Sequence, residues 1–98
     1  MPEPRLEIEY CTKCRFQLRA AWLAQEFLAT FEQELGEVAL LPGSGGIFEV
    51  RLNGELIASN RESKKMPEVS EVKRLVRDRI APDRKIGHDQ GSLEASRG

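Results

Sequence analysis

The stretch Leu6-Glu-Ile-Glu-Tyr-Cys-Thr-Lys-Cys14 decides the fold, because in it a strand pattern runs directly into a pair of cysteines. Apolar and acidic residues alternate from Leu6 to Tyr10, and a period of two is typical of a strand with one buried face. A helical pattern follows, and we expect Gly36 to end it. Its apolar members recur at three- and four-residue spacing: Phe16, Ala20, Leu23, Ala24, Phe27, Phe31 and Leu35.

A hairpin is the clearest local signal in the second half of the chain. Strand-like residues run from 47 to 59 and are interrupted only by Asn53-Gly54, the pair that a two-residue type I′ turn prefers. That turn sets the register, so we expect Val50 to lie opposite Ile57, with Phe48 on the same face. The pattern therefore predicts two antiparallel strands.

Two more elements complete the order β-α-β-β-β-α. Residues 37–41 resemble a strand, and a second helix is expected to open at Pro67 and to end at Pro82. The first two strands should be parallel through a right-handed crossover. Because the first strand alternates, we expect one sheet face to stay uncovered. The sequence predicts an α/β (α+β) fold of two layers, with a four-stranded mixed sheet and both helices on one face.

The composition is that of a small globular protein. The chain has 98 residues, 40% hydrophobic and 32% charged, with a net charge of −1. We expect one domain over residues 1–81 and a flexible polar tail over 82–98. No basic stretch suggests nucleic acid, and no run approaches the roughly 20 apolar residues of a membrane span. The first ten residues lack the apolar run of a signal peptide, so the expected location is the cytoplasm.

The spacing of Cys11 and Cys14 favours redox chemistry. Unpaired N–H groups at a helix start, with Lys13 and Arg15 nearby, favour a thiolate over a thiol. The two-residue spacer lets the second sulfur reach the first and resolve a mixed disulfide. Thr12 stands between the two cysteines. Tyr10 is expected in the core, with a hydroxyl that could line the cysteine site. Both residues belong to the candidate site.

Two other interpretations of the cysteines stay open. Zinc takes four ligands, and only His88, in the tail, could join the two thiols from this chain. Alternatively, both could be partly buried thiols without a role, since free cysteine often behaves as a small hydrophobe. We prefer the redox interpretation and assign neither a metal nor a resident cofactor.

Several motifs in order resemble the selenoprotein W/T/H group, the Rdx family. They are Tyr10-Cys-Thr-Lys-Cys14 after a strand, Gly43-Ser-Gly-Gly46, Gly46-Ile-Phe-Glu-Val50 and the Asn53-Gly54 hairpin. The similarity runs from about residue 6 to residue 80. It implies a thioredoxin-like fold and a thiol-based redox function.

The resemblance and the helix argument disagree on which cysteine attacks. Helix-end electrostatics favour Cys11. In selenoprotein W the second position of the motif is selenocysteine, and the matching position here is Cys14. We favour Cys14, because selenium would be of little use on a buried resolving atom.

The approach to the third strand departs from thioredoxins proper, which place a cis-proline there. Ser44, Gly45 and Gly46 occupy the position before Ile47 instead. We expect this loop to lie beside the cysteines and to offer backbone N–H groups to a peptide or to glutathione. The alternative is that the glycines serve only the turn geometry.

Two classes of function follow from these observations. The first is a small thiol–disulfide oxidoreductase, linked to glutathione or peroxide, whose partners are protein thiols or glutathione. The second is a redox-sensitive binding module without turnover, which would use the uncovered sheet face, for example in a homodimer.

Overall fold

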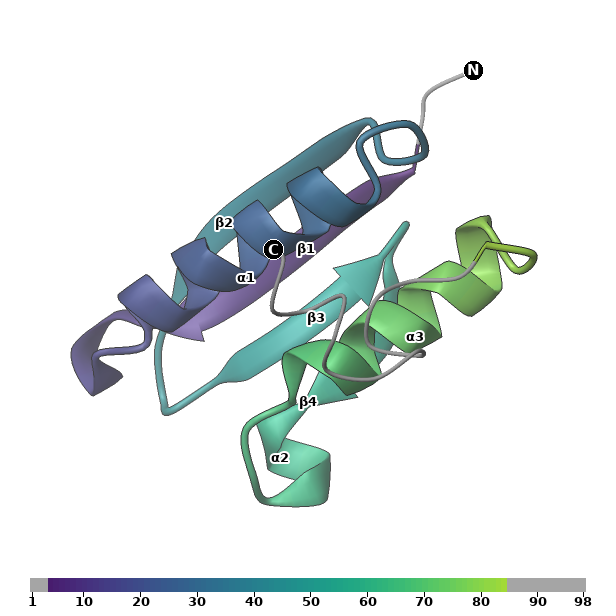
Figure 1. Ribbon diagram of the computed structural model, residues 1–98. Helices are drawn as coiled ribbons and strands as arrows, with labels where there is room; N and C mark the ends of the chain where they lie inside the picture. Colours follow the sequence, from purple (N-terminus) through teal and green to yellow (C-terminus); the bar gives the residue numbers. More distant parts are fainter. Residues whose placement is uncertain (1–3, 85–98) are drawn as a thin grey trace.

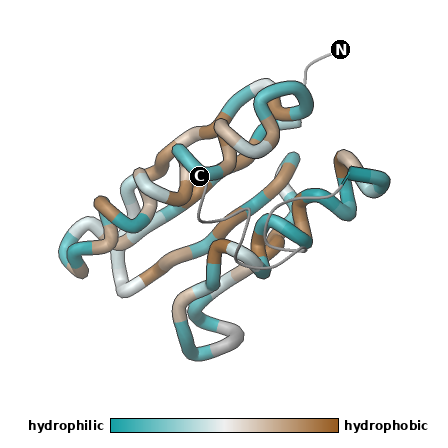
Figure 2. The backbone as a smooth tube through the Cα atoms, in the orientation of Figure 1, coloured by the Kyte–Doolittle hydropathy of each residue, from teal (hydrophilic) through white to brown (hydrophobic). Residues whose placement is uncertain are grey.

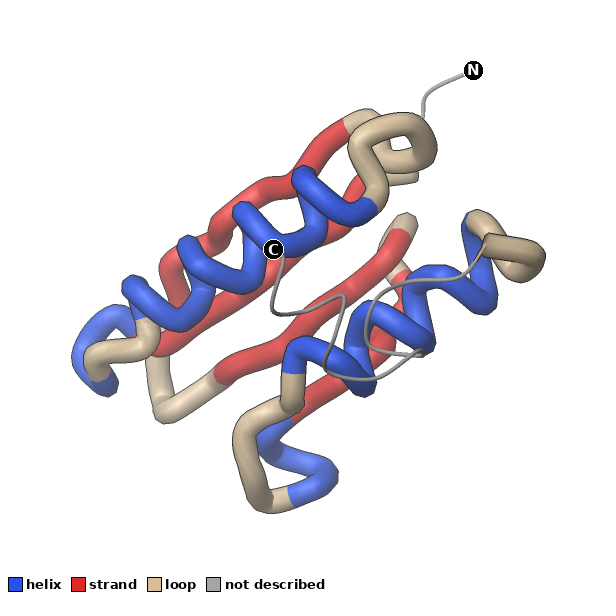
Figure 3. The backbone as a smooth tube through the Cα atoms, viewed as in Figure 1, coloured by secondary structure: helices blue, strands red, loops and turns tan. Residues whose placement is uncertain are grey.

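The predicted order of elements is confirmed, with two short helices added, a 3-10 helix and α2 (Asn60–Ser63). The structure, a computed structural model, describes residues 4–84, without the side chains of residues 62 and 63. Figures 1 and 3 show the arrangement of the helices and strands. The elements are β1 (Arg5–Cys11), a 3-10 helix (Thr12–Cys14), α1 (Gln17–Thr30), β2 (Glu37–Gly43), β3 (Phe48–Leu52), β4 (Glu55–Ser59), α2 (Asn60–Ser63) and α3 (Val69–Ile80).

The sheet is mixed and has four strands in the order β2-β1-β3-β4. β1 runs parallel to β2 and antiparallel to β3, and β3 and β4 form the hairpin. Figure 1 shows α1 lying over β1 and β2, with α3 over β3 and β4 on the same face. The predicted two-layer architecture is therefore confirmed, and no helix of residues 4–84 covers the second face of the sheet.

The core lies between the sheet and the two long helices. Alternate residues of β1 and β3 point into it, while both hydrophobic and hydrophilic residues occur along each helix (Figure 2). Burying a large apolar side chain stabilises a fold by about 1.5–3 kcal/mol, so these residues hold the layers together. The largest fully buried side chains are Phe27, Phe31, Phe48, Leu6, Ile8, Val50, Val72 and Val76.

Helix α1 is shorter than its apolar pattern predicts. It ends at Thr30, and the backbone of Phe31 leaves helical geometry with φ −117° and ψ 36°. A turn follows, in which the amide of Leu35 donates to the carbonyl of Phe31 at 2.8 Å. Both of these apolar residues are still buried, and both belong to the hydrophobic core. Gly36 then donates to the carbonyl of Pro4 at 2.9 Å, and the chain enters β2.

The hairpin has the predicted turn but not the predicted register. Asn53 and Gly54 have φ 51° and 88°, as a type I′ turn requires. Val50 lies opposite Ala58 rather than Ile57, because the pairing shifts between positions 50 and 51. A β-bulge of this kind places one extra residue on β4. Ile57 nevertheless packs against the core.

Two boundaries after the hairpin also differ from expectation. The connection after β4 contains α2, which Ser59 caps by accepting a hydrogen bond from the amide of Arg61 at 3.0 Å. Helix α3 begins at Val69 with Glu68 as its N-cap, two residues later than expected from Pro67. β2 extends to Gly43, because an edge strand tolerates a proline.

The end of the described chain is packed against the domain. Of the predicted tail, residues 82–84 are described, and His88 with the rest lies outside the described residues. The Arg84 guanidinium pairs with Glu34 at 2.7 Å and lies 5.7 Å from the ring centroid of Phe31. Arg84 thus contacts the turn that follows α1, and the domain boundary after residue 81 stays a prediction. None of the helices within residues 4–84 has the length and apolar character that a membrane crossing needs.

Candidate functional site

Cys11 and Cys14 are joined by a disulfide at the carboxyl end of the central strand β1. Their Cα atoms are 5.4 Å apart, a separation that suits a disulfide. The 3-10 helix makes the short turn between them. Arg15 then adopts φ 61°, which redirects the chain so that α1 can begin at Gln17.

The sequence pattern predicts the cysteines at the start of the long helix, and the structure does not place them there. Arg15 and Phe16 separate Cys14 from the first residue of α1. Cys11 caps the 3-10 helix instead, which is only one turn long and has few aligned peptide dipoles. The dipole of α1 is therefore not aimed at Cys11 from an adjacent helix start and gives no reason to favour a Cys11 thiolate.

The two sulfurs differ in their access to solvent. Cys11 is 3% exposed, whereas Cys14 is half-buried. The residues around Cys14 are open, since Thr12, Lys13 and Arg15 are all exposed. An incoming thiol or disulfide can therefore reach Cys14 more easily than Cys11.

The glycine-rich segment between β2 and β3 lies beside the disulfide. Gly43 pairs with Cys11 in the parallel register of β1 and β2. At the other end of the segment, the amide of Cys11 donates to the carbonyl of Ile47 at 2.8 Å. The hydroxyl of Thr12 also donates to the carbonyl of Gly43, at 3.5 Å. Both ends of the segment are thus fixed to the cysteine motif, and Ser44, Gly45 and Gly46 form its tip.

Glycine is needed in this segment for two different reasons. Gly45 and Gly46 have φ 73° and 79°, a region in which a Cβ is unfavourable. At Gly43 a Cβ would lie 2.9 Å from the Oε2 atom of Glu9 and 3.0 Å from the Cγ2 atom of Ile47. The missing side chain at position 43 therefore makes room for the side chains of Glu9 and Ile47.

Asn60 and Phe16 support the site, and the sequence analysis assigned neither to it. The Asn60 side chain donates to the carbonyl of Gly46 at 2.7 Å and accepts from the amide of Phe48 at 2.9 Å. It therefore holds the glycine segment against the start of β3. The Phe16 ring meets the Phe48 ring edge-on, with centroids 5.8 Å apart, which fixes the chain between the disulfide and α1.

Tyr10 belongs to the core rather than to the exposed part of the site. It is 8% exposed and clusters with the other buried residues under the helices. It pairs with Pro42 on one side and with Phe48 on the other. Successive residues of a strand point to opposite faces, so its side chain and that of Cys11 leave β1 in different directions.

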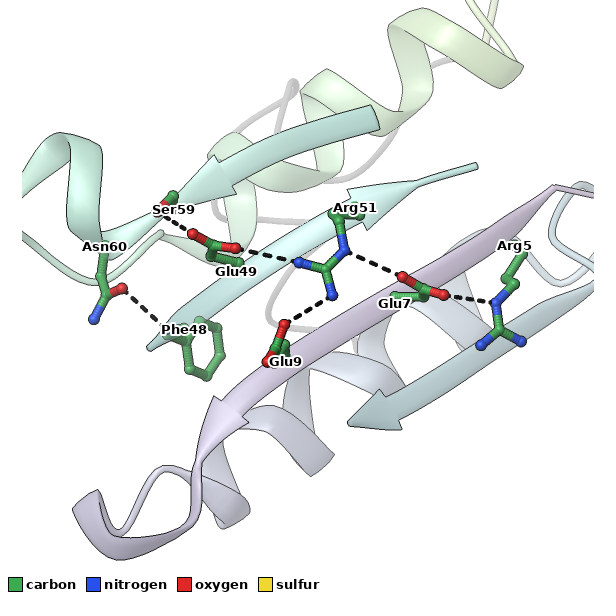
Figure 4. A network of polar contacts seen from close by, with 8 residues as sticks. All are labelled: Arg5, Glu7, Glu9, Phe48, Glu49, Arg51, Ser59 and Asn60. Atoms are coloured by element: carbon green, nitrogen blue, oxygen red, sulfur yellow. Dashed lines mark hydrogen bonds and ion pairs between the residues drawn. The ribbon is translucent and has the colours of Figure 1, made fainter. Parts of the chain in front are cut away.

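The uncovered sheet face carries a network of ion pairs, drawn in Figure 4. The Arg51 guanidinium binds three carboxylates: Glu7 at 3.1 Å, Glu9 at 2.9 Å and Glu49 at 3.2 Å. Glu7 also accepts from Arg5 at 3.0 Å. Hydrogen bonds from Arg5, and then from Arg51, hold the pKa of Glu7 below its usual value of 4.5.

The same face is acidic overall. Arg5 also pairs with Glu37, and the Ser59 hydroxyl donates to Glu49 at 3.1 Å. Counting Glu7, Glu9, Glu37 and Glu49 against two arginines gives four negative and two positive charges, a net −2. A homodimer through this face stays a prediction.

No group of three or more His, Cys, Asp or Glu side chains within residues 4–84 could hold a metal ion. Cys11 and Cys14 are engaged with each other. The alternative with His88 falls outside the described residues.

Comparisons with known proteins agree with this geometry. The model of the Rdx family, whose fold is thioredoxin-like, matches residues 5–78. A crystal structure of a protein from Bordetella parapertussis is 49% identical, with a TM-score of 0.75, and the match covers 78% of this chain and 96% of that chain. The crystal structure of a selenoprotein W-related protein from Vibrio cholerae is 43% identical, also with a TM-score of 0.75, over 78% of this chain and 95% of that one. No curated protein matches. The family match over most of the sequence, at this level of identity to solved relatives, establishes that the chain belongs to the Rdx family.

Proposed function

We propose that this protein is a thiol–disulfide oxidoreductase in which Cys14 attacks and Cys11 resolves. The observation that carries the proposal is the Cys11–Cys14 disulfide, with Cys11 buried and Cys14 half-buried. Membership of a family associated with redox chemistry supports it.

The reaction balances with a disulfide as the oxidant. The Cys14 thiolate attacks one sulfur of a substrate R–S–S–R, which forms a Cys14–S–S–R bond and releases R–S⁻. The Cys11 thiolate then attacks the Cys14 sulfur, so that the Cys11–Cys14 bond forms and a second R–S⁻ leaves. The protein loses two electrons and the substrate gains them. In the reverse direction two thiols, from glutathione or from a partner protein, reduce the protein.

The neighbouring groups have separate parts in this reaction. Lys13 and Arg15 are exposed cations next to Cys14 that would stabilise its thiolate. The backbone at Ser44, Gly45 and Gly46 would meet the substrate, since both ends of that segment are fixed to the cysteine motif. Glutathione is the small co-substrate that we propose, and no resident cofactor is needed.

Single-cysteine variants test which sulfur attacks. The reduced Cys11→Ser variant retains the accessible sulfur and is expected to form a mixed disulfide with glutathione disulfide readily. The reduced Cys14→Ser variant retains the buried sulfur and should react more slowly. Mass spectrometry of alkylated samples over time measures both rates. Faster adduct formation in Cys14→Ser would reverse the assignment.

A further inference from the structure

Positive charge without a partner gathers at the disulfide end of the molecule. Within residues 4–84, six lysine and arginine side chains have neither an ion pair nor a side-chain hydrogen bond: Lys13, Arg15, Arg19, Arg61, Lys64 and Arg74. Lys13 lies in the cysteine motif and Arg15 follows it, while Arg61 and Lys64 belong to α2 and its C-cap. Figure 1 shows that the end of β1, the segment between β2 and β3, and α2 share one end of the fold.

Among the described side chains, the acidic residues at this end of β1 and β3 pair with Arg51 rather than with these cations. Glu9 and Glu49 lie opposite each other on β1 and β3, one pair before the end of the ladder. Both are bound to Arg51 on the uncovered face. The charges of Lys13, Arg15 and Arg61 are therefore available to a ligand.

Arg61 is the cation placed against the glycine segment. A Cβ on Gly45 would lie 3.2 Å from the Nη2 atom of Arg61, so the guanidinium lies directly over that residue. Ser59 and Asn60 fix the backbone on the N-terminal side of Arg61, the first through the amide of Arg61 and the second through the carbonyl of Gly46. Gly45 belongs to the segment whose two ends contact Cys11. The guanidinium and the disulfide thus border the same segment.

From this placement we propose that Arg61 is a specificity-determining residue that selects small disulfides carrying carboxylates close to the sulfur. The proposal rests on the oxidoreductase function proposed above and names the class of substrate. A guanidinium binds a carboxylate through two parallel hydrogen bonds, which a neutral or cationic substrate cannot supply. The covalent step is the one already written: the Cys14 thiolate attacks, and R–S⁻ leaves with its carboxylates.

Rates of oxidation of the reduced, full-length protein test the proposal. The probes are glutathione disulfide, with net charge −2, hydroxyethyl disulfide, which is neutral, and cystamine, with net charge +2. Because the three differ in intrinsic reactivity, the quantity to compare is the rate of the Arg61→Gln variant divided by that of the wild type for each disulfide. We expect a decrease of about two- to five-fold for glutathione disulfide, in the range of exposed ion pairs, and no decrease for the other two.

Arg74→Gln is the matched control, because it removes one exposed, unpaired arginine from α3. It should leave all three rates unchanged. High salt should bring the Arg61→Gln ratio for glutathione disulfide back toward one, since screening weakens exposed charge pairs. Equal ratios for the three disulfides, or an equal effect of Arg74→Gln, would overturn the role of Arg61. A wild type that reacts with none of them would instead refute the proposed function.

Discussion

At the scale of single residues, the glycines between β2 and β3 have two possible roles. They either contact the substrate or serve turn geometry alone. Gly46 and Gly54 both have positive φ, and a Cβ on either would meet nothing within 4 Å. Alanine should cost about 1–2 kcal/mol of stability at each position, because both are left-handed. Only Gly46, however, belongs to the segment beside the disulfide.

We therefore expect Gly46→Ala to slow the reaction with glutathione disulfide and Gly54→Ala to leave it unchanged. Urea denaturation measures the stability of each variant, and the oxidation rate of the reduced protein measures its reactivity. Equal rates for the two variants would mean that the glycines serve turn geometry alone.

Some residues of the candidate site could be assigned from the sequence, and others could not. The spacing of Cys11 and Cys14 indicated a disulfide-forming pair directly. Asn60 could not be assigned to the site, because the backbone groups that it binds belong to Gly46 and Phe48, which only the folded chain brings close. A polar residue after a strand looks the same in the sequence whether it is solvated or holds a loop.

Among helices and strands, α1 and α3 are joined by a buried charge. Lys73 extends its ammonium to Glu26 at 2.9 Å, and the two side chains are 7% and 36% exposed. Loss of Glu26 leaves an unpaired ammonium in a buried place, whereas loss of Lys73 leaves a carboxylate that water can reach.

Glu26→Ala should therefore destabilise the protein by about 1–3 kcal/mol, the cost of a charged hydrogen bond and of its buried partner. Lys73→Met keeps the aliphatic stem in place and should cost less than about 1 kcal/mol. Urea unfolding of the two variants measures the difference. A larger loss for Lys73→Met would show that the ion pair itself stabilises the packing of the helices.

The elements also show the limits of a periodic pattern. The apolar spacing continued to Leu35, but α1 ends at Thr30, because a turn can bury Phe31 and Leu35 as well as a helix can. In the hairpin, the Asn53-Gly54 turn was predictable, and the bulge after Val50 was not. Both Ile57 and Ala58 pack on the core, so the alternation of apolar residues could not indicate where the register shifts.

For the molecule as a whole, the ion pairs of the uncovered face should make stability depend on acid pH. The pKa of Glu7 is lowered below 4.5 by Arg5, and then by Arg51, in the folded protein. A group whose pKa is lower when folded contributes stability that is present above its unfolded pKa and is lost as pH falls through the folded pKa. The loss attributable to Glu7 should thus begin near pH 5 and continue below pH 4.5.

Glu7→Gln removes this contribution, so its unfolding free energy should fall less steeply than that of the wild type between pH 5 and pH 3. Urea denaturation at several pH values gives both curves. Glu55→Gln is the comparison variant. It removes a carboxylate from an exposed ion pair, in which Arg79 likewise lowers the pKa of Glu55. Parallel curves for Glu7→Gln and the wild type would refute a role for the network in acid stability.

The topology of the whole molecule was the most predictable feature. Strand alternation in β1, one crossover helix and a hairpin leave few arrangements, and right-handed crossover selects among them. The alternation of Glu7 and Glu9 with apolar residues correctly indicated an uncovered face. The pairing of its carboxylates with Arg51 depends on side chains from two strands and was not predictable from either strand alone.

The most direct test of the oxidoreductase account is an equilibrium titration of the full-length protein in glutathione redox buffers, read by alkylation and mass spectrometry. We expect a single two-electron transition between a Cys11–Cys14 disulfide and two free thiols, with a potential on the order of −200 to −300 mV. That transition should be absent from the Cys11→Ser and Cys14→Ser variants. A wild-type protein that stays fully reduced or fully oxidised across this range would contradict it.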